Sequence, residues 1–129
     1  MFERIVVGVS KADSAREAAR RAVGIAQKFD ADLHLVIAFD GADAGPQSAS
    51  RRHAEGTVET IAARYPGKHF THALPDDPAT AILRVADEVD ADLIVVGNRG
   101  MRGAGRVLGS VPNSIAHKAS CSVLIVSTT

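Results

Sequence analysis

The chain has 129 residues, of which 46% are hydrophobic and 23% are charged. This length suits one domain with a single buried core, and we expect residues 1–129 to form it. The fifteen acidic and fifteen basic residues cancel, and only five residues are aromatic, so we expect no nucleic-acid partner. The sequence has no apolar run of about 18 residues, so we expect no membrane partner.

Cysteine usage and the N-terminus indicate the compartment. The single cysteine, Cys121, cannot form an internal disulfide. The N-terminal stretch MFERIVV lacks the charged and apolar regions of a secretory signal. We therefore expect a cytoplasmic protein.

The chain begins with a predicted strand and helix. Residues 4–10, RIVVGVS, form a run rich in β-branched side chains, which is typical of a strand buried on both faces of a parallel sheet. Ser14 and Glu17 have the spacing of a capping box, so we expect them to open an amphipathic helix.

A second strand and helix follow. Residues 30–39, DADLHLVIAF, predict a strand that starts directly after a helix. Residues 40–50 are small and polar, and we expect a mobile loop there. The apolar positions of the next helix continue at helical spacing to Tyr65, and the dipeptide beginning at Pro66 stops it.

The second half continues the alternation. Residues 68–74 predict a weaker strand near a sheet edge, and Asp77 with the proline after it predicts the start of a third helix. Residues 90–97, DADLIVVG, repeat the opening of the second strand. A short helix around 111–119 and a final strand at 121–127 complete the pattern.

Strands alternate with helices along the whole chain, which predicts the α/β class. We expect a doubly wound five-stranded parallel sheet in the order 3-2-1-4-5, with helices on both faces. In such sheets ligands bind beyond the carboxyl ends of the strands, where the winding direction reverses. Here that point lies between the first and fourth strands.

A glycine-rich segment leaves the fourth strand at this point. Its glycines are Gly97, Gly100, Gly103, Gly105 and Gly109. Residues 93–129 contain four basic residues and no acidic one. Glycines expose backbone N–H groups, and the following helix adds donors and a positive dipole end. The segment therefore predicts a phosphate site, and Ser110 either caps the helix or binds the anion.

Two familiar phosphate signatures are missing. A P-loop needs a lysine before its Ser or Thr, but Gly109 precedes Ser110. The dinucleotide fingerprint belongs after the first strand, where the sequence reads GVSKADS. The alternative interpretation of the glycines is a tight connection that holds no ligand.

The motif Gly97-Asn-Arg-Gly100, eight residues, then Gly109-Ser110-Val111 resembles the Gly-x2-Gly-x9-Gly-Ser/Thr motif of the universal stress protein family. RIVVGVS, DDPATAI, DADLIVVGNRG and CSVLIV extend the resemblance over the whole chain. It implies a single α/β domain, usually dimeric, whose ATP-binding members hold adenine nucleotide beside the first and fourth strands. The spacing is one residue shorter here, and Ser10 stands where ATP-binding members carry an acid.

The resemblance implies roles for particular residues. Adenine and ribose would lie near Val9 and Ser10, with Ala38 lining the base pocket and the backbone of Val96 and Gly97 contacting base or sugar. The phosphates would be surrounded by Gly100, Gly109, Ser110 and Val111. From charge and proximity we add Arg99, Arg102 and Arg106, for which solvent exposure without ligand contact is an equal alternative. ATP is the expected nucleotide, with AMP and cyclic AMP as alternatives.

Catalytic and metal-binding patterns are weak. No nucleophile, base and acid set is visible, so we expect no catalytic residue and no enzyme activity. His69 and His72 face opposite sides of a strand, so they cannot share a metal. Asp76 and Asp77 have two interpretations, Mg²⁺ binding with a triphosphate or turn and capping roles, and we favour the second.

Three functions remain open. The first is an adenine-nucleotide-binding stress protein whose ligand changes its shape or its partners. The second is a dimeric interaction module that binds no nucleotide, and the third is a slow ATPase. Residues 121–127 are apolar on both faces and predict an exposed sheet edge, so we expect a homodimer through this strand.

Overall fold

The computed structural model describes residues 1–10, 13–98 and 110–127. Its strands are β1 (Arg4–Gly8), β2 (Asp32–Ala38), β3 (His69–Leu74), β4 (Leu93–Gly97) and β5 (Ser122–Val126). Its helices are α1 (Asp13–Phe29), the 3₁₀ turn η1 (Gly41–Asp43), α2 (Ala49–Ala62), α3 (Pro78–Val89) and α4 (Ser110–Lys118). The strands are parallel and form one sheet in the order β3-β2-β1-β4-β5, which confirms the predicted doubly wound fold.

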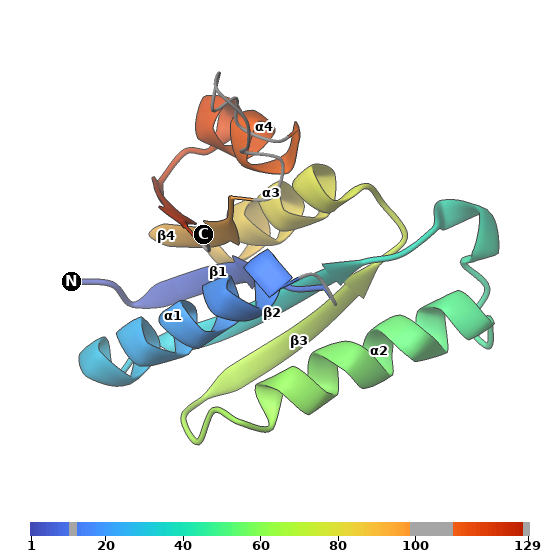
Figure 1. The fold of residues 1–129 in the computed structure, drawn as a ribbon, viewed down its shortest axis with the longest axis horizontal. Coiled ribbons are helices and arrows are strands. Elements are labelled where there is room, and N and C mark those ends of the chain that lie inside the picture. Colours follow the sequence, from blue (N-terminus) through green and yellow to red (C-terminus); the bar gives the residue numbers. More distant parts are fainter. Residues whose placement is uncertain (11–12, 99–109, 128–129) are drawn as a thin grey trace.

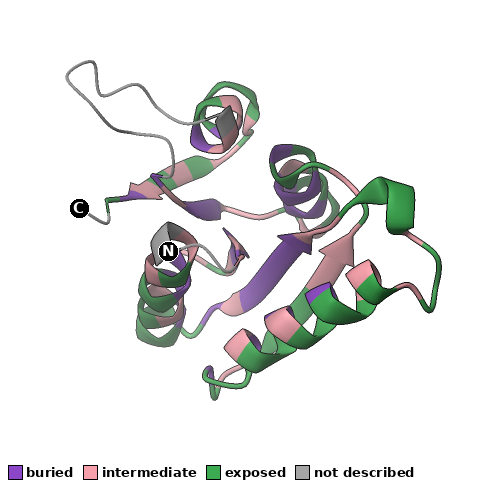
Figure 2. Ribbon diagram, turned by 45° about the vertical axis from the view of Figure 1, so that its right-hand side comes forward, coloured by how far each residue is buried: buried purple, intermediate pink, exposed green. Residues whose placement is uncertain are grey.

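Helices cover both faces of this sheet (Figure 1). On the α1 and α2 face, Ile5 and Val7 pack in one buried cluster with Ala22. On the α3 and α4 face, Val6 packs in a second cluster with Ile82. Because consecutive β1 side chains enter opposite clusters, β1 is buried on both faces, as its β-branched run predicts. Figure 2 shows exposed residues along the outer side of α2.

The repeated Asp-Ala-Asp sequence forms the same turn twice. Asp30 and Asp90 have φ angles of 53° and 55°, in the left-handed region that ends many helices. In each turn the amide of the next residue donates to a carbonyl five residues earlier, at 2.9 Å. The turns end α1 and α3 and lead directly into β2 and β4, which is why the repeat predicts both strand starts.

The start of α1 differs from the prediction. The helix begins at Asp13, so Ser14 lies inside its first turn. The Glu17 carboxylate accepts hydrogen bonds from Arg20 at 2.8 Å and Arg21 at 3.1 Å. Glu17 thus pairs with arginines one turn further along the helix, where opposite charges lie close together. The capping role of Ser14 stays a prediction, because its side chain lies outside the described residues.

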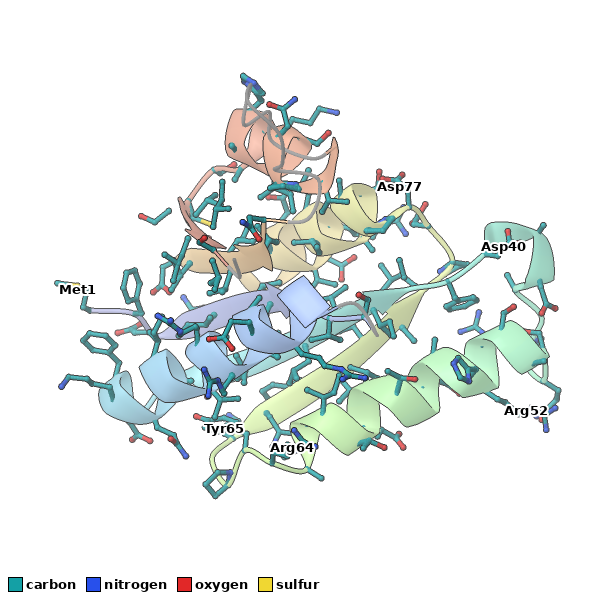
Figure 3. The ribbon with its side chains drawn as sticks, viewed as in Figure 1. Met1, Asp40, Arg52, Arg64, Tyr65 and Asp77 are labelled. Atoms are coloured by element: carbon teal, nitrogen blue, oxygen red, sulfur yellow. The ribbon has the colours of Figure 1, made fainter. Side chains whose placement is uncertain are left out.

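The end of α2 also differs. The helix ends at Ala62, so Tyr65 lies beyond it rather than on its last turn. The Tyr65 side chain is buried, and its hydroxyl donates to the carbonyl oxygen of Ala31 at 2.8 Å (Figure 3). Tyr65 thus connects the segment after α2 to the turn before β2. No helix within the described part of the chain is long and apolar enough to cross a membrane.

Candidate functional site

The carboxyl ends of β1 and β4 lie side by side at the centre of the sheet. The two strands are parallel neighbours, with Val7 opposite Val95. α1, the helix that follows β1, packs on one face of the sheet, and α4, the helix that follows β4, packs on the other (Figure 1). The predicted reversal of winding is therefore present between these strands.

Residues at the end of β1 form one side of this edge. Val9 is 6% exposed, and its amide donates to the Val36 carbonyl at 2.8 Å, so the backbone stays paired with β2 one residue beyond the strand. Ser10 follows and is partly buried. Gly8 was missed by the sequence analysis, yet a β-carbon there would overlap the side chain of Ile82. Glycine thus lets α3 pack directly over the end of β1.

The end of β4 forms the other side. Val96 is buried and Gly97 is the last residue of the strand. Asn98 comes next and is only 5% exposed, although its side chain is polar. The sequence analysis gave Asn98 no role beyond its position in the glycine motif. A polar residue directly after a strongly apolar strand is the signal that would have marked it.

Ala38 is the last residue of β2 and packs partly buried against the cluster on the α3 side. The amide of Phe39 donates to the Leu74 carbonyl at 3.0 Å, which holds the ends of β2 and β3 together. The Arg51 guanidinium lies 4.9 Å from the centre of the Phe39 ring. The end of β2 is therefore bonded to β3, and the Phe39 ring next to it contacts Arg51 of α2.

The segment expected to be a mobile loop contains a chain of hydrogen bonds. Asp40 accepts from the Ala42 amide at 2.9 Å and caps η1 (Figure 3). The Ser48 hydroxyl caps α2 by accepting from the Arg51 amide, and it donates to the Asp43 carbonyl at 2.9 Å. These bonds give the connection from β2 to α2 a defined shape.

The N-terminus of α3 reaches the same edge of the sheet. The Asp77 carboxylate caps it, accepting from the amide and the hydroxyl of Thr80 at 3.1 and 2.6 Å. These hydrogen bonds hold the pKa of Asp77 below its usual value. Asp76 forms an ion pair with Arg84 at 3.1 Å. The favoured capping role of Asp77 is thus confirmed.

The N-terminus of α4 follows the glycine-rich segment. Ser110 is the first residue of the helix, and Val111 packs partly buried against the cluster on the α3 side. Pro112 is fully buried and has no amide hydrogen. The first turn of α4 therefore offers one backbone donor fewer than an ordinary helix.

Some predicted site residues cannot be placed. Outside the described residues lie Arg99, Gly100, Arg102, Arg106 and Gly109, together with the side chain of Ser110. The structure thus brings together Val9, Ser10, Val96 and Gly97 at the central edge, with Ala38 one strand away.

Within the described ranges, no group of three or more His, Cys, Asp or Glu side chains could hold a metal ion. His34 and His72 nevertheless meet, with Nδ1 of the first 3.0 Å from Nε2 of the second. The sequence analysis missed this pair because the two residues are far apart in the chain and meet only through the register of β2 and β3.

Comparison with known proteins decides the family. The model of the universal stress protein family matches residues 1–127. The chain belongs to this family. Two universal stress proteins are similar over nearly its whole length. One from Mycobacterium tuberculosis is 34% identical, covering 99% of this chain and 98% of its own. One from Methanocaldococcus jannaschii is 31% identical, covering 98% and 82%.

Solved structures of the family have the same fold. A universal stress protein in complex with cAMP is 36% identical, with a TM-score of 0.76, covering 99% of this chain and 98% of its own. A universal stress protein from Archaeoglobus fulgidus in complex with dAMP is 26% identical, with a TM-score of 0.73, covering 96% and 97%.

Proposed function

We propose that this universal stress protein binds an adenine nucleotide at the carboxyl ends of β1 and β4. The observation that carries the proposal is the meeting of Val9 and Ser10 with Val96 and Gly97 where the winding reverses. Backbone at this edge lies open to base and sugar contacts in doubly wound folds. Two relatives with the same fold are complexes with the adenine nucleotides cAMP and dAMP.

In this proposal the glycine-rich segment and the start of α4 bind the phosphates. The motif from Gly97 to Val111 supplies glycines, three arginines and no acid. A phosphate beside the first turn of α4 would meet backbone donors and the positive end of the helix dipole. Because Pro112 removes one of those donors, the arginines gain importance for holding more than one phosphate.

Ser10 provides a basis for choosing among adenine nucleotides. In cAMP the 3′-oxygen is part of an anionic cyclic phosphate, whereas ATP and AMP carry free 2′- and 3′-hydroxyls. A carboxylate at position 10 would accept bonds from free hydroxyls but would repel a phosphate at the 3′-oxygen. A neutral serine does neither strongly. We therefore propose that a serine here lets the chain accept cAMP beside ATP and AMP, and that it holds the free hydroxyls of ATP and AMP less tightly than a carboxylate would.

The test is a reciprocal change of affinity, measured by titration calorimetry. Ser10→Asp should weaken cAMP binding and strengthen ATP and AMP binding, each by on the order of tenfold. Ser120→Asp is the matched control. Ser120 is exposed and lies just before β5, at the amino ends of the strands and away from the proposed site. Absence of binding by the wild type to any adenine nucleotide would refute the function. Equal changes for cAMP and ATP would refute only the role of Ser10.

We also propose that the protein is a homodimer through β5, and that nucleotide occupancy changes which partners it meets. β5 is an edge strand of the sheet, and its Leu124 side chain is 38% exposed. Pairing with a second copy would cover that side chain and the unpaired backbone of the edge. A cytoplasmic location belongs to the same proposal, since the single cysteine suits a reducing compartment.

A further inference from the structure

His34 and His72 form an interstrand pair on the sheet face that carries α3. β2 and β3 are parallel, with His34 opposite Phe70 and Val36 opposite His72. The imidazoles are therefore diagonal neighbours, and their nitrogens are 3.0 Å apart. β3 is an edge strand, so β2 is its one neighbour among the strands that the structure describes.

The pair is buried among groups of both charges. His34 is 7% exposed and stacks on Phe70 with ring centroids 4.7 Å apart, while His72 is partly buried. The charged side chains that act on the pair come from every element around it: Arg4 of β1, Asp32 of β2, Lys68 just before β3 and Glu88 of α3. Arg4 and Lys68 lower the pKa of His34, whereas Asp32 raises the pKa of His34 and Glu88 raises that of His72.

The hydrogen bond between the rings depends on the number of protons. In the neutral pair one nitrogen donates its N–H and the other accepts. A first added proton leaves this N–H···N bond in place, because one of the facing nitrogens is still bare. A second proton fills both facing nitrogens, so two N–H groups and two positive charges then oppose each other.

We propose that the His34–His72 pair is a pH-sensitive latch that fastens the edge strand β3 to β2 and releases it in mildly acidic solution. α2 packs against β3 and β2, so opening of the latch loosens β3 together with α2. The inner strands β1 and β4 keep both of their neighbours. The proposal concerns a region apart from the proposed nucleotide site and does not depend on it.

Burial supports the direction of this switch. It lowers the pKa of both imidazoles below the usual value, and the mutual repulsion of the two rings adds to this for His34. The released form then takes up protons at a higher pH than the folded form does. The stabilisation is present above the ordinary histidine pKa of about 6.5 and is lost as the pH falls through the lower folded values.

Amide hydrogen exchange of the full chain tests the latch. Rates are corrected for intrinsic pH dependence and compared at about pH 7 and about pH 5. In the wild type, the opening constant of residues 69–74 should rise by about tenfold or more. In His72→Gln, which keeps a hydrogen-bonding side chain without a titrating group, the rise should be less than about threefold. Residues 93–97 should respond alike in both proteins.

His69→Gln is the matched control, because His69 lies on the same strand but is exposed, and its ring nitrogen lies beside the Gly67 carbonyl rather than another histidine. It should keep the full response of the wild type. An equal pH response in wild type and His72→Gln would overturn the latch. A nuclear magnetic resonance titration of the wild-type imidazoles tests it without any variant, and titration of both rings near about 6.5 would also overturn it.

Discussion

At the scale of single residues, buried polar groups carry sharp predictions. Tyr65 is 3% exposed and bonds the Ala31 carbonyl at 2.8 Å. Tyr65→Phe keeps the ring but leaves that carbonyl without its partner, so unfolding free energy should fall by about 1–2 kcal/mol. Urea denaturation at neutral pH measures the change, and an unchanged midpoint would show that the hydroxyl is dispensable.

Replacing each of two glycines by alanine should change the stability of the protein in opposite directions. Gly56 lies inside α2, and a β-carbon there would meet open space. Gly56→Ala should therefore stabilise the protein by about 0.5–1 kcal/mol, because alanine loses less entropy in a helix. Gly8→Ala should destabilise it, because the new methyl group would overlap Ile82. Thermal denaturation of the pair checks both signs, and stabilisation by Gly8→Ala would contradict the packing of α3 on β1.

The sequence identified some of these residues and not others, for physical reasons. Gly97 was predicted correctly at the end of the fourth strand, whereas the first strand ends at Gly8, two residues earlier than predicted. Gly8 and the pairing of His34 with His72 depend on which elements face each other. Helix placement and strand register decide those contacts, and a single sequence does not contain them explicitly.

At the scale of elements, the contribution of the Ser48 cap of α2 to stability can be measured. The Ser48 hydroxyl accepts from the Arg51 amide at 3.1 Å and donates to the Asp43 carbonyl. Ser48→Ala should cost about 1 kcal/mol of unfolding free energy. Ser50→Ala is the control, since Ser50 lies within the helix rather than at its cap. Equal effects of the two substitutions in urea denaturation would contradict the capping role.

Element boundaries were harder to predict than element types. The Asp-Ala-Asp repeat correctly marked both helix-to-strand turns, because aspartate tolerates the left-handed φ that such a turn needs. The spacing of Ser14 and Glu17 did not indicate that Glu17 pairs with nearby arginines. The extent of α2 was misjudged because an apolar residue at helical spacing, Tyr65, packs equally well from a turn.

At the scale of the whole molecule, the two sheet edges differ in their predicted roles. If β5 is the dimer strand, Leu124→Lys should shift the mass measured by light scattering from dimer to monomer, because a lysine there opposes edge pairing. Thr71→Lys places the same charge at an exposed position of β3, the opposite edge, and should leave the dimer intact. A wild-type monomer at micromolar concentration would contradict the proposed assembly.

The alternation of strands and helices predicted a parallel α/β sheet, whereas it did not predict the ligand. The expected order 3-2-1-4-5 is the observed one, so β1 and β4 end side by side. In the proposed site the choice of nucleotide depends on a few side chains at this edge, Ser10 among them. Composition and periodicity do not say which adenine nucleotide these side chains favour.

The most direct test of the nucleotide site is chemical-shift mapping of the ¹⁵N-labelled protein during titration with cAMP. The account predicts that the shifted backbone amides cluster at the carboxyl ends of the strands and the start of α4, at Gly8, Val9, Ser10, Gly97, Asn98 and Val111. The chemical shifts of amides at the amino ends of the strands, such as those of Arg4 and Leu93, should not change. Saturating cAMP that shifts nothing, or that shifts only the amino ends or the outer side of α2, would contradict the account.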